Sequence, residues 1–317
     1  ETASPLTIAQ EGQVWYNSSS DVLKGYKLTP GTGAWSSGGA MNTTRAQNAQ
    51  AGTQTAGLLA GGGPPAGSVN VETYDGSAWA EVANLNTAVR LQPGAGTQTS
   101  ALSITGYTTT WVGGTESWNG TSWTEVNAVN TARNQGGGSG ASNTSAIIFG
   151  GESGPPWIPN KDKTEEYNGT SWSEVNDMNQ GRTQNSMSGS ATGAITGAGN
   201  APPFSNDAET WDGTSWSEIS NLNISAEGRM GAGTANTAGL IYGGRASPTY
   251  YANTEDWNGT SWVEVADLAS ARYNGSGFGT ATAAILAGGS NPGTGGSTTT
   301  EEWNVPQPIV IKTFTAS

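Results

Sequence analysis

Short runs of apolar residues alternate with polar and small residues along the whole chain, and the pattern recurs at a period of roughly 45 residues. Five segments share one order, in which an aromatic residue, an Asn-Gly or Asp-Gly pair and a Trp follow one another: Tyr74–Trp79, Trp118–Trp123, Tyr167–Trp172, Trp211–Trp216 and Trp257–Trp262. Asn-Gly and Asp-Gly are strong hairpin signals, because both central residues of a type I′ turn need positive φ. Each segment therefore predicts a tight β-hairpin.

Two further strands are expected before each hairpin. The first is Gly-rich, as at Ala49–Thr53, where only small residues would fit between converging strands. The second is a small apolar strand that ends in Gly-Gly, at Gly57–Gly62, Ala146–Gly151, Gly239–Gly244 and Ala283–Gly289; the other two modules carry Gly106-Tyr107 and Gly197-Ala198. Four short strands at this period are typical of a propeller blade. Gly, Thr and Asn are weak helix formers, so the chain is predicted to be all-β.

The number of modules follows from an Arg that comes roughly ten residues after each Trp. These residues are Arg45, Arg90, Arg133, Arg182, Arg229 and Arg272, and they indicate six blades. The last module stops after Asn304 without a second Trp, whereas Trp35 stands alone near the N-terminus. We expect the Trp35 strand to complete the last blade and so remove an open sheet edge.

Three regions follow from this reading. The six-bladed propeller is expected at 31–304, an N-terminal extension with a β-hairpin over Gly12–Leu28 at 1–30, and an extended tail at 305–317. In the tail, Ile309–Phe314 reads as a strand that pairs with the hairpin or leads into further chain.

The Gly-Gly doublets, the aromatic followed by a Trp, and the downstream Arg resemble the kelch repeat, over about Trp35 to Trp303. The aromatic spacing is one residue shorter than that family's. The Asn-Gly-Thr-Ser-Trp modules, together with the hairpin Glu11-Gly12-Gln13-Val14-Trp15-Tyr16-Asn17, are also similar to structural proteins of tailed bacteriophages, especially those of marine cyanobacteria. This resemblance implies a virion protein whose hairpin joins other virion proteins. Alternatively, the hairpin covers one end of the propeller.

Composition removes several classes of function. The chain has neither Cys nor His, which excludes disulfides, thiolate metal sites and Ser–His or Cys–His catalysis. A formal charge of −13 opposes binding to a nucleic acid backbone. No apolar run is long enough to span a membrane, and Glu1–Gln10 lacks the features of a signal peptide. No cofactor or metal is expected.

The repeated acids and arginines are the most regular polar feature. A Glu stands two residues before the first aromatic of each hairpin, at Glu72, Glu116, Glu165, Glu209 and Glu255. These residues could form a carboxylate ring for a metal or for acid–base chemistry. However, a catalytic pair is needed once, whereas a tie between blades is needed in every module. We therefore expect Arg45, Arg90, Arg133, Arg182, Arg229 and Arg272 to pair with these Glu residues or with carbonyls of a neighbouring blade.

Non-repeated loops are the better candidates for binding. They follow the Gly-Gly strands and are expected on one face of the ring, at Gly62–Asn70, Tyr107–Gly114, Glu152–Lys163, Gly199–Asp207, Arg245–Asn253 and Ser290–Ser297. They contain aromatic residues that the module does not explain: Trp111, Trp157, Phe204, Tyr250 and Tyr251. Such side chains suit stacking on sugar rings or contact with a protein, or they pack the loops against the ring.

Three functions are compatible with these features. The first is a non-enzymatic virion module of a phage tail or fibre that presents the loop face to a glycan or protein of the host surface. The second is a secreted or surface adhesion propeller of a bacterium, which gene neighbours would distinguish. The third is a carbohydrate-active enzyme that uses only carboxylates, for which the non-repeated acids are Asp162, Asp207 and Glu227. These three are too few and too scattered to support a mechanism.

Overall fold

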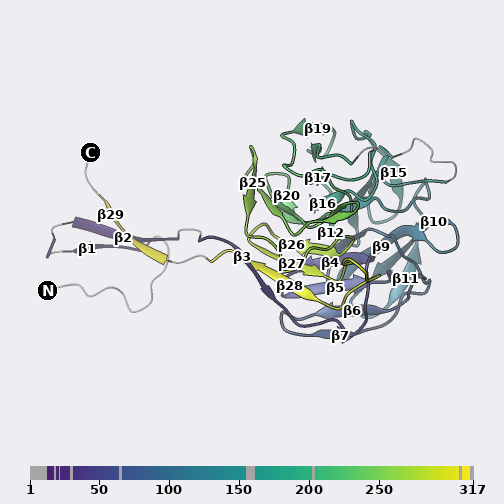
Figure 1. The fold of residues 1–317 in the computed structure, drawn as a ribbon, viewed down its shortest axis with the longest axis horizontal. Helices are drawn as coiled ribbons and strands as arrows, with labels where there is room; N and C mark the ends of the chain where they lie inside the picture. Colours follow the sequence, from purple (N-terminus) through teal and green to yellow (C-terminus); the bar gives the residue numbers. More distant parts are fainter. Residues whose placement is uncertain are drawn as a thin grey trace.

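The computed structural model describes residues 13–17, 19–20, 22–28, 31–63, 66–154, 161–201, 204–306 and 309–314. All secondary structure in these ranges is β, and six antiparallel sheets of four strands are arranged in a ring (Figure 1). The predicted six-bladed β-propeller is confirmed.

Within each blade the strands run from the axis outwards. Blade 1 contains β4 (Ala49–Thr53), β5 (Ala56–Ala60), β6 (Val71–Tyr74) and β7 (Trp79–Glu81). Blade 2 contains β8 (Gly94–Thr97), β9 (Ser100–Tyr107), β10 (Trp111–Trp118) and β11 (Trp123–Val126). Blade 3 contains β12 (Gly137–Ser142), β13 (Ser145–Phe149), β14 (Thr164–Tyr167) and β15 (Trp172–Glu174). Blade 4 contains β16 (Ser186–Ser190), β17 (Gly193–Gly197), β18 (Ala208–Trp211) and β19 (Trp216–Ile219). Blade 5 contains β20 (Met230–Ala235), β21 (Ala238–Tyr242), β24 (Thr254–Trp257) and β25 (Trp262–Val265), with a small hairpin of β22 (Arg245–Ala246) and β23 (Thr249–Tyr250) in its loop.

Blade 6 combines the two ends of the propeller. It consists of β26 (Ser276–Gly279), β27 (Ala283–Ala287), β28 (Thr300–Asn304) and β3 (Ala34–Ser37). Trp35 lies opposite Trp303 in this pairing, and its indole N–H donates to Thr254 Oγ1 of blade 5 at 2.9 Å. The expected closure by the Trp35 strand is thus confirmed.

Apolar side chains fill the space between neighbouring blades. Ile104 of blade 2, for example, packs in one cluster with Ile148 and Trp172 of blade 3. Near the axis the strands approach too closely for larger residues: a Cβ on Gly231 would lie 2.3 Å from the carbonyl oxygen of Met187. This close approach explains the Gly-rich first strand of each module.

A closed ring of backbone hydrogen bonds joins all six blades beside the axis. The N–H of Gln47 donates to Asn274 O. The equivalent backbone bonds, with the donor named first, join Leu91 to Gln47, Gln135 to Leu91, Gln184 to Gln135, Gly228 to Gln184 and Asn274 to Gly228, and all six are 2.7–3.0 Å long. All six residues have positive φ, although only one is Gly. We call these residues the axial ring.

The Gly-Gly doublet forms a second set of ties. The second residue of each doublet donates its N–H to a backbone carbonyl in the link that leads into the next blade, as Gly151 does to Arg182 O at 2.9 Å. Both positions have positive φ, which favours Gly. In two modules the doublet position falls on Thr105-Gly106 and Ala198-Gly199, one residue away from the pairs expected from sequence.

Antiparallel strand order places the connections at two ends of the ring. The turns between the first and second and between the third and fourth strands lie at one end, which we call the turn face. Here the Asn-Gly turns are locked by their own side chains: Asn119 Oδ1 accepts the N–H groups of Thr121 and Ser122 at 2.9 Å. The loops between the second and third strands and the links between blades lie at the other end, the loop face.

A separate three-stranded sheet stands outside the ring, on the side where β3 of blade 6 lies (Figure 1). It pairs β1 (Val14–Asn17) and β2 (Val22–Leu28) of the N-terminal hairpin with β29 (Ile309–Phe314) of the tail. Of the two roles considered for Ile309–Phe314, the structure shows pairing with the hairpin. The sheet thus gathers both ends of the described chain.

Candidate functional site

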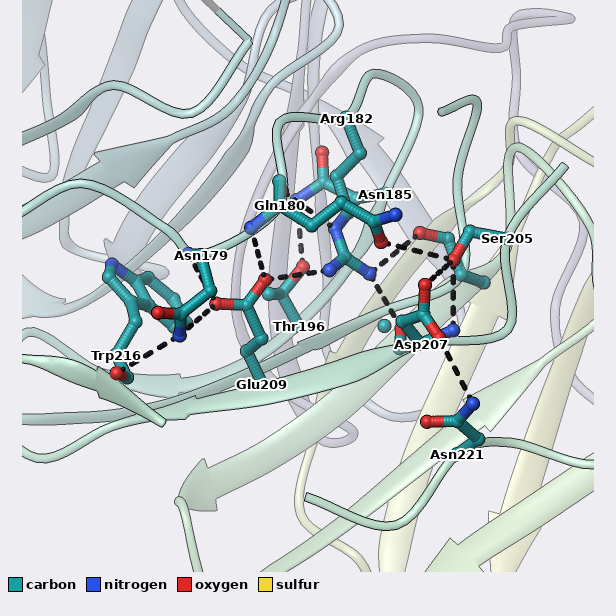
Figure 2. A network of polar contacts seen from close by, with 12 residues as sticks. Asn179, Gln180, Arg182, Asn185, Thr196, Ser205, Asp207, Glu209, Trp216 and Asn221 are labelled. Carbon is teal, nitrogen blue, oxygen red and sulfur yellow. Dashed lines mark hydrogen bonds and ion pairs between the residues drawn. The ribbon is translucent and has the colours of Figure 1, made fainter. Parts of the chain in front are cut away.

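Each repeated Glu is the centre of a buried polar network, and Glu209 in β18 shows it most completely (Figure 2). Its Oε1 accepts from Arg182 Nη2 at 2.7 Å. Its Oε2 accepts the backbone N–H and the side-chain amide of Asn179 at 2.8 and 2.9 Å. Asn179 and Arg182 belong to the link that arrives from β15 of blade 3. The carboxylate therefore ties blade 4 to the chain that comes from its neighbour.

The guanidinium of Arg182 also donates hydrogen bonds to backbone carbonyls. Its Nη1 donates to Asp207 O at 2.6 Å and to Ala198 O at 3.3 Å. Burial lowers the pKa of Arg182, and the charge of Glu209 opposes that shift. Because an Arg does not lose its proton in proteins, the pair remains ionic. All the acceptor sites needed for acid–base chemistry on this Glu are already occupied.

The same arrangement recurs around the ring. Buried ion pairs join Arg45 to Glu72, Arg133 to Glu165, Arg182 to Glu209, Arg229 to Glu255 and Arg272 to Glu301. Glu301 is the equivalent residue of the last module, which the sequence reading had left out. We call these pairs, with their Asn and Thr neighbours, the frame.

Blade 2 differs from the expectation for Arg90. Glu116 is 7% exposed and accepts two bonds from Asn86 and one from Thr87, but among the described residues no Arg reaches it. Val89 holds the position equivalent to Arg45, since each lies two residues before its axial-ring residue. Arg90 is therefore one residue out of register and points to the loop face instead.

Arg229 also lies at a different position in its module, but it still pairs with its Glu. Ala226 holds the equivalent position in blade 5, and Arg229 reaches Glu255 at 2.6 Å from three residues further along. The sequence contained this signal: ten residues separate Trp from Arg in four modules, but 11 separate Trp79 from Arg90 and 13 separate Trp216 from Arg229.

Six bridge pairs lie at the loop face, next to the frame. In each, the residue after the Arg position pairs with the residue after the doublet position: Ala46 with Gly63, Arg90 with Tyr107, Asn134 with Glu152, Thr183 with Asn200, Glu227 with Arg245 and Tyr273 with Ser290. No two of these pairs have the same combination of residue types. The modules thus combine a repeated buried frame with a variable rim.

The first group of rim residues is the Arg90 cluster, formed by Arg90, Tyr107 and Trp111. The guanidinium carbon of Arg90 lies 5.4 Å from the centre of the Tyr107 ring. Trp111 packs edge-on against the same ring at 5.7 Å, and its buried Nε1 has no hydrogen-bond partner. Strands β9 and β10 have eight residues each, longer than their counterparts in the other blades, and the extension carries this cluster.

The second group is the Arg245 cluster, formed by Glu227, Arg245, Tyr250 and Tyr273. The Arg245 guanidinium lies 4.0 Å from the centre of the Tyr273 ring, and Tyr250 packs edge-on to that ring at 5.5 Å. Glu227 Oε1 accepts from Arg245 Nε at 2.9 Å. Unlike Arg90, this cation is neutralised.

The aromatic residues singled out from sequence do not form one site. Trp111 and Tyr250 belong to the two clusters, whereas Phe204 lies in a separate loop of blade 4 and bridges to Asn200. Tyr251 is half-buried, and its backbone bonds to Gly244 O and Arg272 N. Trp157 lies outside the described residues.

Tyr107, Arg245 and Tyr273 are not among the candidates predicted from sequence, and Glu227 is considered there only as a non-repeated acid. The signal that could have identified Arg245 and Tyr273 is their place in the module, immediately after the Gly-Gly doublet or the Arg, where the residue type changes from one module to the next. Tyr107 had been assigned to the doublet itself.

The described residues give little support for a metal site or for catalysis by carboxylates. No group of three or more acidic side chains is arranged to hold a metal ion there. Two of the three non-repeated acids are engaged: Asp207 accepts from Ser205 and Asn221, and Glu227 from Arg245 and Asn200. No helix in the part of the chain that the structure describes is long and apolar enough to cross a membrane.

Comparison with known proteins adds information on the fold. No protein-family model matches the chain, and no curated protein matches it. Among solved structures, the chain is similar to the structure of YjhT, with a TM-score of 0.70 and 11% sequence identity, over 87% of this chain and 99% of that chain. A likeness at this identity supports the propeller fold and leaves the function to be inferred from the site.

Proposed function

We propose that the chain is a non-enzymatic binding and structural module of a phage virion, part of a tail or fibre, whose kelch-like propeller presents its loop face to a glycan or protein of the host surface. One observation carries this proposal: the repeated polar residues are consumed by the frame, whereas the non-repeated aromatic and charged residues lie on one face. A recognition surface needs such variable side chains on a rigid support.

The Arg90 cluster fits recognition particularly well. The other propeller arginines contact carboxylates, but among the described residues Arg90 has no acidic partner. Its guanidinium and the adjacent aromatic rings offer a hydrogen-bond donor and stacking surfaces side by side. A ligand can use both, since neither is needed to hold the blade together.

The three-stranded sheet suits attachment to other virion proteins. Val14, Tyr16 and Leu23 are 51%, 53% and 44% exposed. Tyr16 lies opposite Leu23 in the β1–β2 pairing, and alternate residues of a strand share a face, so the three side chains occupy one face. An exposed apolar face of this kind favours contact with another protein.

Replacing Trp111 or Tyr250 with Ala is expected to reduce binding to host cells or to glycan-array spots at least fivefold, because a stacking contact contributes about 1 kcal/mol or more. The melting temperature should stay within a few degrees of wild type. Thr121→Ala on the turn face is the matched control and should bind normally. Unchanged binding by both loop-face variants would refute the assignment of the binding face.

Detection of the chain in purified virions by mass spectrometry tests the virion part of the proposal separately. Its absence from virions, together with binding to cells, would favour the bacterial adhesion propeller.

A further inference from the structure

The loop-face end of the propeller axis contains a cavity of about 80 Å³, which we call the upper axial cavity, and the axial ring surrounds it. All six axial-ring residues line it, and eight of its lining residues are Asn or Gln. A second cavity of about 260 Å³ lies at the turn-face end and is lined largely by Gly, Ala, Ser and Thr. Gln50 and Met187 line both cavities, and the Gln50 amide donates to Met187 Sδ at 3.3 Å. These two side chains separate the cavities.

Several buried amide atoms of the upper cavity have no hydrogen-bond partner. They are Asn48 Nδ2, Gln92 Oε1, Gln184 Oε1 and Asn185 Oδ1. Asn48, Gln92 and Asn185 are only 4%, 3% and 5% exposed. A buried polar group without a partner costs about 1–3 kcal/mol. Four such groups around one cavity indicate an occupant that the protein alone does not supply.

Neighbouring residues fix which atoms remain available. The Gln92 amide NH₂ donates to Ala60 O at 3.0 Å, so its Oε1 is left over. The Asn185 NH₂ donates to Thr196 Oγ1 at 2.8 Å, and that hydroxyl donates in turn to Ser186 O. Asn48 instead accepts from Ser276 through Oδ1 and keeps its NH₂ free. The residues that line the cavity therefore carry one unpaired amide NH₂ group and three unpaired amide oxygens.

The combination of unpaired donors and acceptors indicates which charge a molecule bound in the cavity would carry. A cation would lack a carboxylate, because none of the described lining residues is Asp or Glu, and the lining includes Arg229. An anion would face three carbonyl oxygens. A hydroxyl group satisfies both sets, since it donates one hydrogen bond and accepts others.

We infer that the upper axial cavity is a subsite for the hydroxyl or hydroxymethyl end of a neutral saccharide. This inference rests on the proposed binding at the loop face and specifies its ligand. The volume equals that of about two or three waters, so only the tip of a sugar enters. Tyr273 does not line the cavity itself, but it precedes Asn274 of the axial ring and belongs to the Arg245 cluster on the same face. Aromatic side chains on the face where hydrogen-bonding amides line a cavity suit recognition of a sugar.

Crystals soaked with methyl β-glucoside, methyl α-mannoside or methyl β-galactoside test the inference directly. We expect at least one glycoside to place a hydroxyl oxygen within hydrogen-bond distance of Gln92 Oε1, Gln184 Oε1 or Asn185 Oδ1. Only water in the cavity, with the glycoside bound elsewhere or not at all, would overturn the inference.

Affinity measurements separate this subsite from the proposed function. Gln184→Met removes a side-chain amide that has no hydrogen bond to the described residues, so the fold should tolerate it, and the affinity for the bound glycoside should fall about tenfold. Gln92→Met should have a similar effect. Gln98→Met, whose amide lies at the turn face and bonds to Gly57 O and Tyr74 O, is the control and should leave affinity unchanged. If Trp111→Ala weakens binding to host cells and the two cavity variants do not, the inference fails and the proposed function stands.

Discussion

Replacing Glu209 with Ala is expected to lower the free energy of unfolding by about 3–5 kcal/mol, the usual loss when one partner of a buried ion pair is removed. The Arg182 guanidinium would remain buried without its counterion, and the two N–H donors of Asn179 would lose their acceptor. Urea denaturation monitored by Trp fluorescence measures this loss.

Glu218 provides the control, because it lies directly across from Glu209 on β19 and is exposed. Glu218→Ala should change the free energy of unfolding by no more than about 0.5 kcal/mol. Equal effects of the two substitutions would show that the buried frame does not hold the blades.

Removing β3 should have a still larger effect. A chain that begins at residue 38 lacks Trp35, which packs edge-on against Tyr242 of blade 5 at 4.8 Å and against Trp303 at 5.6 Å. Trp35 is half-buried, and its packing is lost together with the whole pairing between β3 and β28. In addition, β28 would become an open edge, and such edges promote association between chains. We therefore expect a marked fall in melting temperature and concentration-dependent aggregation, measured by calorimetry and light scattering.

A chain that begins at residue 31 is the matched comparison. It also loses β1 and β2, and with them the partner of β29, but it keeps β3 and the closed ring. Its propeller should melt at the wild-type temperature. If both truncations behave alike, closure of blade 6 by β3 does not stabilise the ring.

The blades could be predicted because their signals are local. The Asn-Gly and Asp-Gly pairs do mark the hairpins, as between Trp118 and Trp123, but they lie in four-residue loops in which only the Gly has positive φ, so the expected type I′ turn is wrong. Closure by Trp35 was also predictable, since the last module lacked one strand and the N-terminus had one to spare.

The polar partners were harder to predict, because they depend on register at the axis. Arg90 and Arg229 each follow a Trp at about the right distance, but one residue of displacement moves Arg90 from the frame to the rim. Similarly, the axial ring is made of backbone groups on residues as different as Leu91, Gln135 and Gly228. Side-chain identity carries no signal for such a feature.

Hydrogen exchange of the free protein and of its complex with the array glycan that binds most tightly tests the division between frame and loop face most directly. We expect slower exchange on binding in segments 105–112 and 243–252, which carry parts of the two clusters, and no change in the turn-face segments 119–122 and 258–261. Protection confined to the turn-face segments, with exchange at 105–112 and 243–252 unaltered, would contradict it.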